Sequence, residues 1–373
     1  MQEPGWLMTE TQTTSLKDLL SRHTHDGVLY RTLDNGKIEC YACGHRCIIG
    51  EGRDGICKVR FNRDGVLHVP WGYAGGIQLD PVEKKPFFHV LPGNLALSFG
   101  MLGCDYHCGY CQNWVTSQAL RDPEAVSLPE FFTPKDFVDI ALKRNAAIVT
   151  STYNEPLITS EWGVEIFKLA KQSGLVTSYV SNGNGTPEVL EYIQPWVDLY
   201  KVDLKGFNDK QYRKLGGVLQ NVLDTIELLH QKKFWLEIVT LIVPGFNDSE
   251  HELREIANFI SSVSPEIPWH VTAFHSDYNM MDTPNTSVAS LLRAVDIGES
   301  AGLFYVYAGN MPGSVRNHEN TYCPNCHGKL IERRGYTILN NQLKNGSCPT
   351  CETAIPGVWK TPVTKHFSTY IHS

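Results

Sequence analysis

The sequence predicts an α/β protein, with a partial barrel of parallel βα units between a small cysteine-rich unit and a small metal-binding unit. A chain of 373 residues is too long for a single small hydrophobic core, and its length suits a central domain with a smaller unit at each end. Between Leu95 and Tyr307, apolar runs of strand length alternate with amphipathic segments of helical period, which is typical of a parallel sheet. We therefore predict three units, at residues 1–92, 93–312 and 313–373.

Seven apolar runs are rich in β-branched or aromatic residues and predict strands at Leu95–Met101, Ala147–Thr152, Val176–Val180, Leu199–Asp203, Trp235–Val243, His270–Phe274 and Leu303–Tyr307. Start and stop signals predict helices that begin at Thr133 or Pro134, at Leu157, after the cap Thr186, and at Asp248 or Ser249. About six βα units fit, which is fewer than a closed barrel needs, so we expect a partial (βα)6-type barrel. Its active site should lie at the carboxyl edge of the strands.

Composition narrows the class of partner. The chain has 33 basic and 40 acidic residues and no basic stripe, so nucleic acid is not an expected partner. No stretch of about 20 apolar residues exists, and Met1 to Leu20 lacks the apolar segment of a signal peptide. We expect a cytoplasmic protein that does not bind a membrane.

The eleven cysteines fall into groups of four, three and four at short ligand spacings. In a reducing compartment such groups indicate metal binding or redox chemistry, whereas the alternative is a set of small buried core residues. The central group, Cys104, Cys108 and Cys111, has the spacing C-x3-C-x2-C directly after the first predicted strand. Three thiolates leave one iron of a cubane cluster open, whereas a structural zinc site closes with four ligands. His107 offers such a fourth ligand, so a zinc site is the alternative.

This loop resembles that of the radical S-adenosylmethionine (SAM) superfamily, in which a [4Fe-4S] cluster binds SAM at its open iron. The resemblance implies reductive cleavage of SAM to a 5′-deoxyadenosyl radical, which abstracts a hydrogen atom. It places Tyr110 near the SAM adenine, with ordinary packing as the alternative. The segment with Asn154 and Glu155 stands where the superfamily commonly has Gly-Gly-Glu, which implies that Glu155 binds the SAM amino group. The alternative is a buried carboxylate that caps the next helix.

The same resemblance extends to the later connections of the predicted barrel. Ser181 and Asn182 are similar to the turn that contacts the SAM carboxylate or ribose, or form a plain polar turn. Asp203 and Lys205 resemble the pyruvate formate-lyase activating enzyme group, where this segment faces SAM, and the alternative is a structural ion pair. His275 is similar to a residue that reaches the ribose in that group, or has a structural role.

The flanking groups each have four cysteines. The N-terminal group fits either a tetrahedral zinc site or a closed cubane cluster, and of these we favour a structural zinc, at Cys40, Cys43, Cys47 and Cys57. The C-terminal group resembles a zinc ribbon or rubredoxin-like pair of knuckles and is expected to fold its unit around zinc, at Cys323, Cys326, Cys348 and Cys351.

Four motifs together resemble the AmmeMemoRadiSam system radical SAM enzymes, which are relatives of the pyruvate formate-lyase activating enzyme. They are the upstream cysteines, Tyr153–Pro156, Val202–Gly206 and Val306–Asn310. The resemblance implies Memo-like and AMMECR1-like proteins as partners and an electron donor such as a flavodoxin or ferredoxin. It leaves the substrate open, with activation of a partner protein as one option. Two alternative functions from other classes of protein are a non-catalytic metal- or cluster-binding protein and an electron-transfer protein.

Overall fold

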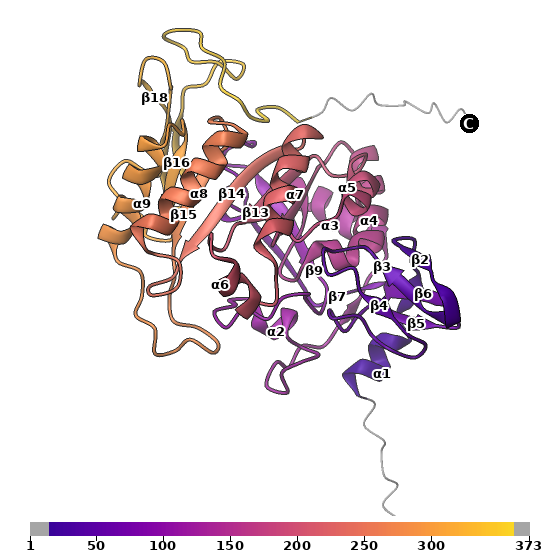
Figure 1. The fold of residues 1–373 in the computed structure, drawn as a ribbon. Helices are drawn as coiled ribbons and strands as arrows, with labels where there is room; N and C mark the ends of the chain where they lie inside the picture. The colour runs from indigo at the N-terminus through magenta and orange to yellow at the C-terminus, as the bar shows by residue number, and fades with distance from the viewer. Residues whose placement is uncertain (1–14, 362–373) are drawn as a thin grey trace, which may run out of the picture.

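The computed structural model describes residues 15–361 and confirms a mixed α/β chain built around one large sheet (Figure 1). The sheet has eight strands in the order β16-β15-β14-β13-β12-β11-β9-β8. Its strands are β8 (Gly76–Pro81), β9 (Leu95–Gly100), β11 (Ala146–Ser151), β12 (Val176–Ser181), β13 (Leu199–Asp203), β14 (Trp235–Ile242), β15 (Trp269–Ala273) and β16 (Val306–Gly309). Strands β9 to β16 run parallel in chain order, so their carboxyl ends meet at one edge.

Strand β8 is the exception to the parallel arrangement. It pairs antiparallel with β9, with Ile77 opposite Phe99. Because β8 precedes residue 93, the sheet takes one strand from the stretch that the sequence assigned to the N-terminal unit. The edge strands β8 and β16 do not pair with each other, as expected for a partial barrel.

Helices connect the parallel strands, and the longer ones cover the outer face of the sheet, whereas the short helix α2 lies at its lower edge in Figure 1. They are α2 (Trp114–Ser117), α3 (Pro134–Lys143), α4 (Ser160–Gln172), α5 (Pro187–Ile193), α6 (Asp209–Lys214), α7 (Leu219–Gln231), α8 (Glu250–Val263) and α9 (Val288–Ser300), with the 3-10 turn η3 (Pro156–Thr159) before α4. Three predicted starts are confirmed by side-chain caps, because Thr133, Thr186 and Ser249 accept from backbone N–H groups in the first turns of α3, α5 and α8. Helix α8 buries Leu253 and Ile260 on the face toward the core.

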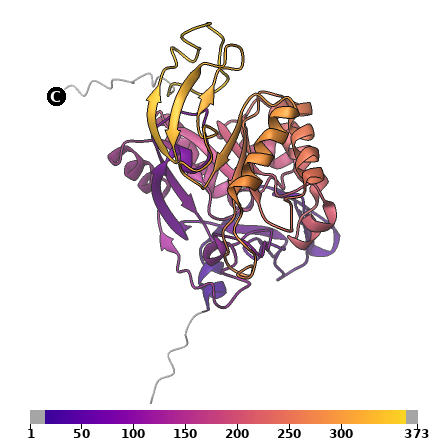
Figure 2. The same cartoon turned by 90° about the vertical axis from the view of Figure 1, so that its left-hand side faces the viewer.

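The two small units lie at opposite ends of the molecule (Figures 1 and 2). The N-terminal part contains α1 (Leu16–Ser21), β1 (Thr24–Asp26), β2 (Tyr30–Thr32), η1 (Asp34–Gly36), β3 (Ile38–Cys40), β4 (Ile48–Ile49), β5 (Phe61–Arg63), β6 (Val66–Pro70), β7 (Tyr73–Ala74) and η2 (Val82–Lys84), and β7 pairs with β10 (Glu130–Phe131). The C-terminal part is a three-stranded sheet of β17 (Thr321–Tyr322), β18 (Lys329–Arg334) and β19 (Thr337–Asn341).

The C-terminal sheet packs directly on the barrel. Phe88 and Tyr307 share an apolar cluster with Cys323, Leu330 and Ile355. Residues 1–14 and 362–373, which belong to the predicted outer units, lie outside the described residues. Across residues 15–361, no helix combines the length and apolar character that a membrane crossing requires.

Candidate active site at the cysteine loop

The central cysteines occupy the loop after β9, at the carboxyl edge of the sheet. Cys108 is buried, and Cys104 and Cys111 are half-buried. The Tyr106 backbone N–H donates to Cys104 Sγ at 3.4 Å, and Ser117 Oγ lies 3.2 Å from Cys111 Sγ. The loop therefore supplies its own hydrogen bonds to two of the three sulfurs, the kind of contact that tunes a cluster's potential.

Burial governs the protonation of these thiols. It raises the pKa of Cys108 to about 12, although Lys205 acts in the opposite direction. Burial and then Asp105 raise the pKa of Cys104 well above its ordinary value. Because metals bind the thiolate, metal loading at this loop must displace protons and is expected to depend on pH.

Two adjoining cavities open at this loop. The smaller, of about 100 Å³, is lined by all three cysteines and by six of the residues predicted to bind SAM, namely Asn154, Glu155, Ser181, Asn182, Asp203 and Lys205. The larger, of about 350 Å³, shares Cys108, Cys111, Asp203 and Lys205 with it and is also lined by Tyr110. The structure thus brings residues from four separate strand ends around the cysteines.

Glu155 is buried and has two roles in the structure. Its carboxylate accepts from the Ser181 hydroxyl at 2.7 Å, from the Asn182 backbone N–H at 2.8 Å and from the Leu157 backbone N–H at 3.0 Å. It therefore caps η3, the alternative considered from the sequence, and also fixes the turn after β12. Burial and then Asp105 raise its pKa to about 8. Binding of the SAM amino group by Glu155 stays a prediction.

The residues that replace the usual glycines have a structural explanation. Tyr153 adopts φ +66°, the left-handed conformation that glycine favours. Asn154 Oδ1 accepts from the Met101 backbone N–H at 3.1 Å and so ties the end of β9 to the end of β11. This segment can therefore make the sharp turn without glycine.

Asp203 forms the ion pair that the sequence raised as an alternative. Lys205 Nζ lies 3.5 Å from Asp203 Oδ2, and Lys201 donates to Asp203 Oδ1. Burial would raise the pKa of Asp203, but the two lysines lower it below its usual value. Both members line both cavities, so the pair is placed to meet a bound ligand, although its contact with SAM stays a prediction.

The two remaining residues predicted to bind SAM, Tyr110 and His275, differ in their exposure to solvent. Tyr110 is buried, and its ring packs edge-on against Phe246 with centroids 5.6 Å apart. His275 is exposed, lies 2.9 Å from Gln112 Nε2 and lines neither cavity, so its contact with the ribose also stays a prediction. His107 packs over Gly216, where a Cβ would come within 2.7 Å of the imidazole. Because His107 lines neither cavity, the structure gives no support to a fourth, zinc-completing ligand.

Several residues around the site were not predicted from the sequence. Asp105 accepts from the side-chain amides of Asn182 and Asn184 at 2.7 and 2.8 Å. Lys85 donates to Asp80 at 2.6 Å and lies 3.0 Å from the Tyr153 hydroxyl, at the wall of the larger cavity. No local signal marks these residues, because each contact joins distant parts of the chain.

The larger cavity also draws on the barrel interior and on the C-terminal unit. His270 Nε2 lies 2.7 Å from Glu237 Oε2, and both side chains are buried. Tyr336, from the turn between β18 and β19, lines the cavity and donates from its hydroxyl to Asn310 Oδ1 at 3.3 Å. The C-terminal unit therefore forms part of the wall beside the cysteines.

The C-terminal cysteines form a compact site. Cys323 Sγ lies 3.5 Å from Cys351 Sγ, Cys326 Sγ lies 3.6 Å from Cys348 Sγ, and all four sulfurs are within 4.8 Å of one another. Four thiolates at about 2.3 Å from one tetrahedral ion stand about 3.8 Å apart, so this set fits a single metal ion.

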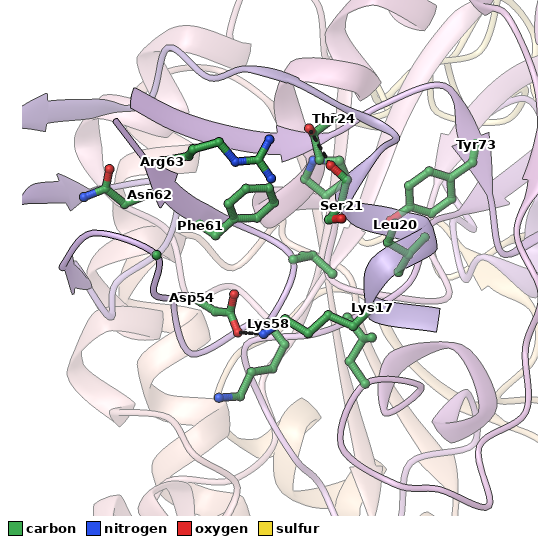
Figure 3. A pocket seen from close by; sticks show the side chains of 14 residues that line it. Lys17, Leu20, Ser21, Thr24, Asp54, Lys58, Phe61, Asn62, Arg63 and Tyr73 are labelled. Carbon is green, nitrogen blue, oxygen red and sulfur yellow. Dashed lines mark hydrogen bonds and ion pairs between the residues drawn. The ribbon is translucent and has the colours of Figure 1, made fainter. Parts of the chain in front are cut away.

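A third cavity, of about 180 Å³, lies in the N-terminal unit (Figure 3). Lys17 and Leu20 of α1 line one side, and Phe61 and Arg63 of β5 line another. It contains none of the predicted site residues.

The donor set of the central loop fits an open cubane cluster. It offers three thiols to the smaller cavity and no fourth cysteine or histidine there, and the same cavity contains both carboxylate and ammonium groups. Cys104, Cys108 and Cys111 would hold the cluster, and Glu155 and Asn182 line the same cavity, where they would be available to a ligand bound at the open iron.

Comparison with known proteins agrees with this chemistry. Residues 100–260 match the family model of the radical SAM superfamily. An uncharacterized protein of Methanocaldococcus jannaschii is 35% identical over 330 residues, which cover 87% of this chain and 97% of that protein.

Two solved structures are also similar to parts of the chain. A domain of the pyruvate-formate lyase-activating enzyme from Bacteroides vulgatus covers 43% of this chain and 98% of its own, at 20% identity and a TM-score of 0.39. Streptococcus suis SuiB bound to S-adenosylmethionine covers 65% and 56%, at 14% identity and a TM-score of 0.47. From the family match and the full-length relative, the chain belongs to the radical SAM superfamily and is an enzyme of that class.

Proposed function

We propose that this enzyme cleaves SAM reductively at the cluster held by Cys104, Cys108 and Cys111, and directs the resulting radical to a substrate in the larger cavity. The observation that carries the proposal is the shared wall of the two cavities. Cys108, Cys111, Asp203 and Lys205 line both, so a ligand on the open iron lies next to space for a second molecule. The cluster supplies one electron to SAM, and the chain supplies position and charge.

The chain's own residues have distinct tasks in this proposal. Asp203 and Lys205 offer one anionic and one cationic group to the zwitterionic end of SAM, while Tyr110 packs behind the adenine. The fixed turn of Ser181 and Asn182, held by the Glu155 carboxylate, keeps backbone and side-chain donors in place. The burial of Cys108 limits the access of water to this part of the reacting region.

We also propose that the chain is an AmmeMemoRadiSam system enzyme of the cytoplasm, with zinc in its C-terminal site. The motifs at Tyr153–Pro156, Val202–Gly206 and Val306–Asn310 support the subtype, and the short sulfur spacing supports zinc. On this proposal a flavodoxin or ferredoxin supplies the electron, and Memo-like and AMMECR1-like proteins are partners. The substrate stays open, and activation of a partner protein is one option that the resemblance to the activating enzymes raises.

The test is electron paramagnetic resonance of the anaerobically reconstituted, reduced protein with and without SAM, together with an assay for 5′-deoxyadenosine. We expect a cubane signal that shifts when SAM is added, and release of 5′-deoxyadenosine. Cys108→Ala should abolish this release because two thiolates cannot hold the cluster properly, while Cys348→Ser, at the distant C-terminal site, should retain it. Zinc without a cluster signal under any of these conditions would instead favour a non-catalytic metal-binding protein.

A further inference from the structure

The N-terminal cysteines are gathered by a short hairpin and the loop that follows it. The Cys40 backbone N–H donates to the Cys47 carbonyl at 2.9 Å, across the start of the turn between β3 and β4. The loop returns so that the Ile56 backbone N–H donates to Cys47 Sγ at 3.5 Å. Cys43 and Cys57 share an apolar cluster with neighbouring side chains. Four thiols from three turns therefore meet in one place.

These thiols lie in a mostly buried environment. Cys40, Cys43 and Cys57 are buried, and Cys47 is half-buried. Within one small unit, such a set of buried thiols is a ligand set rather than core packing.

The spacing of the sulfurs separates two kinds of metal site. In residues 15–361, the C-terminal cysteines are the only group of three or more that brings its ligand atoms within 4.8 Å of one another. Neither the N-terminal four nor the central three do so. Sulfurs on one zinc ion stand about 3.8 Å apart, whereas each thiolate of a cubane binds a different iron, so its sulfurs stand further apart. Among the described residues, the N-terminal set therefore lacks the short mutual spacing of a one-ion zinc site, as does the cluster-binding loop.

The N-terminal set also lies directly against that loop. At Gly103, which has φ +92° and precedes Cys104, a Cβ would come within 3.0 Å of the Cys57 carbonyl oxygen. On the other side, the Gly44 backbone N–H donates to the Asn184 carbonyl at 2.8 Å, and Asn184 bonds to Asp105. Arg121, from the segment after the central loop, donates to the Ile56 carbonyl at 2.5 Å. One metal loop is thus packed on the other.

From these observations we infer that Cys40, Cys43, Cys47 and Cys57 bind a second iron–sulfur cluster, and that zinc is confined to the C-terminal site. Two observations carry the inference: in residues 15–361 these cysteines do not have the short spacing of the C-terminal site, and they pack against the central cysteine loop. The inference replaces the structural zinc favoured from the sequence. With four thiolates the cluster has no open iron and does not bind SAM. The chemistry it supplies is one-electron storage, next to the loop of the SAM-binding cluster. Of its four ligands, Cys47 is the most exposed to solvent.

The first experiment removes the central cluster and asks what iron is left. The variant Cys104→Ala/Cys108→Ala/Cys111→Ala, reconstituted anaerobically, should retain about four iron and four sulfide per chain, against about eight of each in the wild type. Adding Cys43→Ala and Cys57→Ala should remove that remainder. Mössbauer spectra of the triple variant should show a cubane cluster that does not change with SAM. Zinc in place of this iron, or no metal at these cysteines, overturns the inference.

A second experiment guards against variants that fail to fold. Cys326→Ser/Cys348→Ser, which touches only the C-terminal site, should reduce zinc from about one per chain to none and leave the iron content unchanged. If about one zinc per chain survives, the N-terminal set binds zinc and the inference is wrong. Both readouts are metal contents and spectra, so they stand whether or not the enzyme cleaves SAM, and failure here is distinguishable from failure of the proposed function.

Discussion

Asn182 donates from its side-chain amide to Asp105 Oδ1 at 2.7 Å, and so joins the turn after β12 to the residue that follows Cys104. Asn184 makes a second such bond to Oδ2 of the same carboxylate at 2.8 Å. All three side chains are buried. A single carboxylate thus holds the cysteine loop and a ligand turn in register, which is a positioning role that no motif marked.

Replacing this carboxylate should loosen the loop. Asp105→Ala leaves two buried amides without acceptors, at a cost of about 1–3 kcal/mol for each. We expect urea unfolding to shift to lower concentration and iron content after reconstitution to fall. Asp105→Asn keeps one acceptor oxygen, so its urea midpoint and iron content should lie between those of Asp105→Ala and those of the wild type. An unchanged unfolding curve for Asp105→Ala, with the exposed Asp282→Ala as control, would contradict this role.

Two glycines of the cysteine loop should respond differently to alanine. Gly103 has φ +92°, and a Cβ would come within 2.8 Å of Val59 Cγ1, so Gly103→Ala should cost about 1–3 kcal/mol through backbone strain and also push the two metal loops apart. At Gly109 the backbone has negative φ, and the nearest contact would be an ordinary 3.6 Å to Met280 Cγ, so Gly109→Ala serves as the matched control. Thermal unfolding and iron content measure both. Equal effects of the two substitutions would argue against the tight packing at Gly103.

Acid should weaken the interface between the barrel and the C-terminal unit. His89 Nδ1 lies 2.7 Å from the Pro356 carbonyl, which can only accept, so the neutral ring donates there and Nε2 accepts from the Tyr307 hydroxyl. Burial lowers the pKa of His89 from 6.5 to about 4. Between pH 6.5 and pH 4, His89 is protonated in the unfolded chain but stays neutral in the folded chain. The free energy of unfolding therefore falls as the pH drops from about 6.5 to about 4, by roughly 3 kcal/mol in all.

The measurement is the unfolding free energy across this pH range. His89→Gln keeps a donor and an acceptor but cannot titrate, so its curve should be flatter than that of the wild type. His251→Gln, at an exposed position of α8, should keep the wild-type slope. If the unfolding free energy changes with pH in the same way in all three proteins, His89 is not the source of the acid sensitivity.

Loss of the C-terminal metal should be local. Cys348→Ser removes one of four ligands that stand within 4.8 Å of one another, so zinc content should drop and the strands β18 and β19 should become sensitive to protease. The iron content should stay at the wild-type value, because the other cysteine groups are separate. Mass spectrometry of the cleavage products locates the opened segment, and iron lost in proportion to zinc would refute independent sites.

The sequence predicted what local pattern determines. Strand β13 has the predicted bounds, and the starts of α3, α5 and α8 follow from Thr133, Thr186 and Ser249. The three central cysteines and six of the residues predicted to bind SAM line one cavity, because parallel strands bring their carboxyl ends to one edge. Strand β16 was placed too early: it begins at Val306 rather than Leu303.

The elements and site residues that were not predicted from the sequence depend on long-range contacts or lack a local sequence signal. Helix α7 was not located because Val218, the residue before it, makes no side-chain cap, although Leu219, Val222 and Ile226 repeat on its buried face. Lys201 reads as one residue of a strand, and only the structure shows it beside Asp203 in the cavity. Strand β8 joins the sheet by antiparallel pairing, which a pattern of βα units does not predict.

On the proposed function, the placement of Tyr336 gives the C-terminal unit a part in selecting the substrate. Because this tyrosine stands in the wall of the larger cavity and bonds to Asn310, a chain cut after the barrel would lose a side of its own reaction chamber. On the proposed function, truncation or insertion in the C-terminal unit is expected to alter the size of molecule that fits the larger cavity. In relatives, the length of the turn between β18 and β19 becomes a trait to compare with substrate preference.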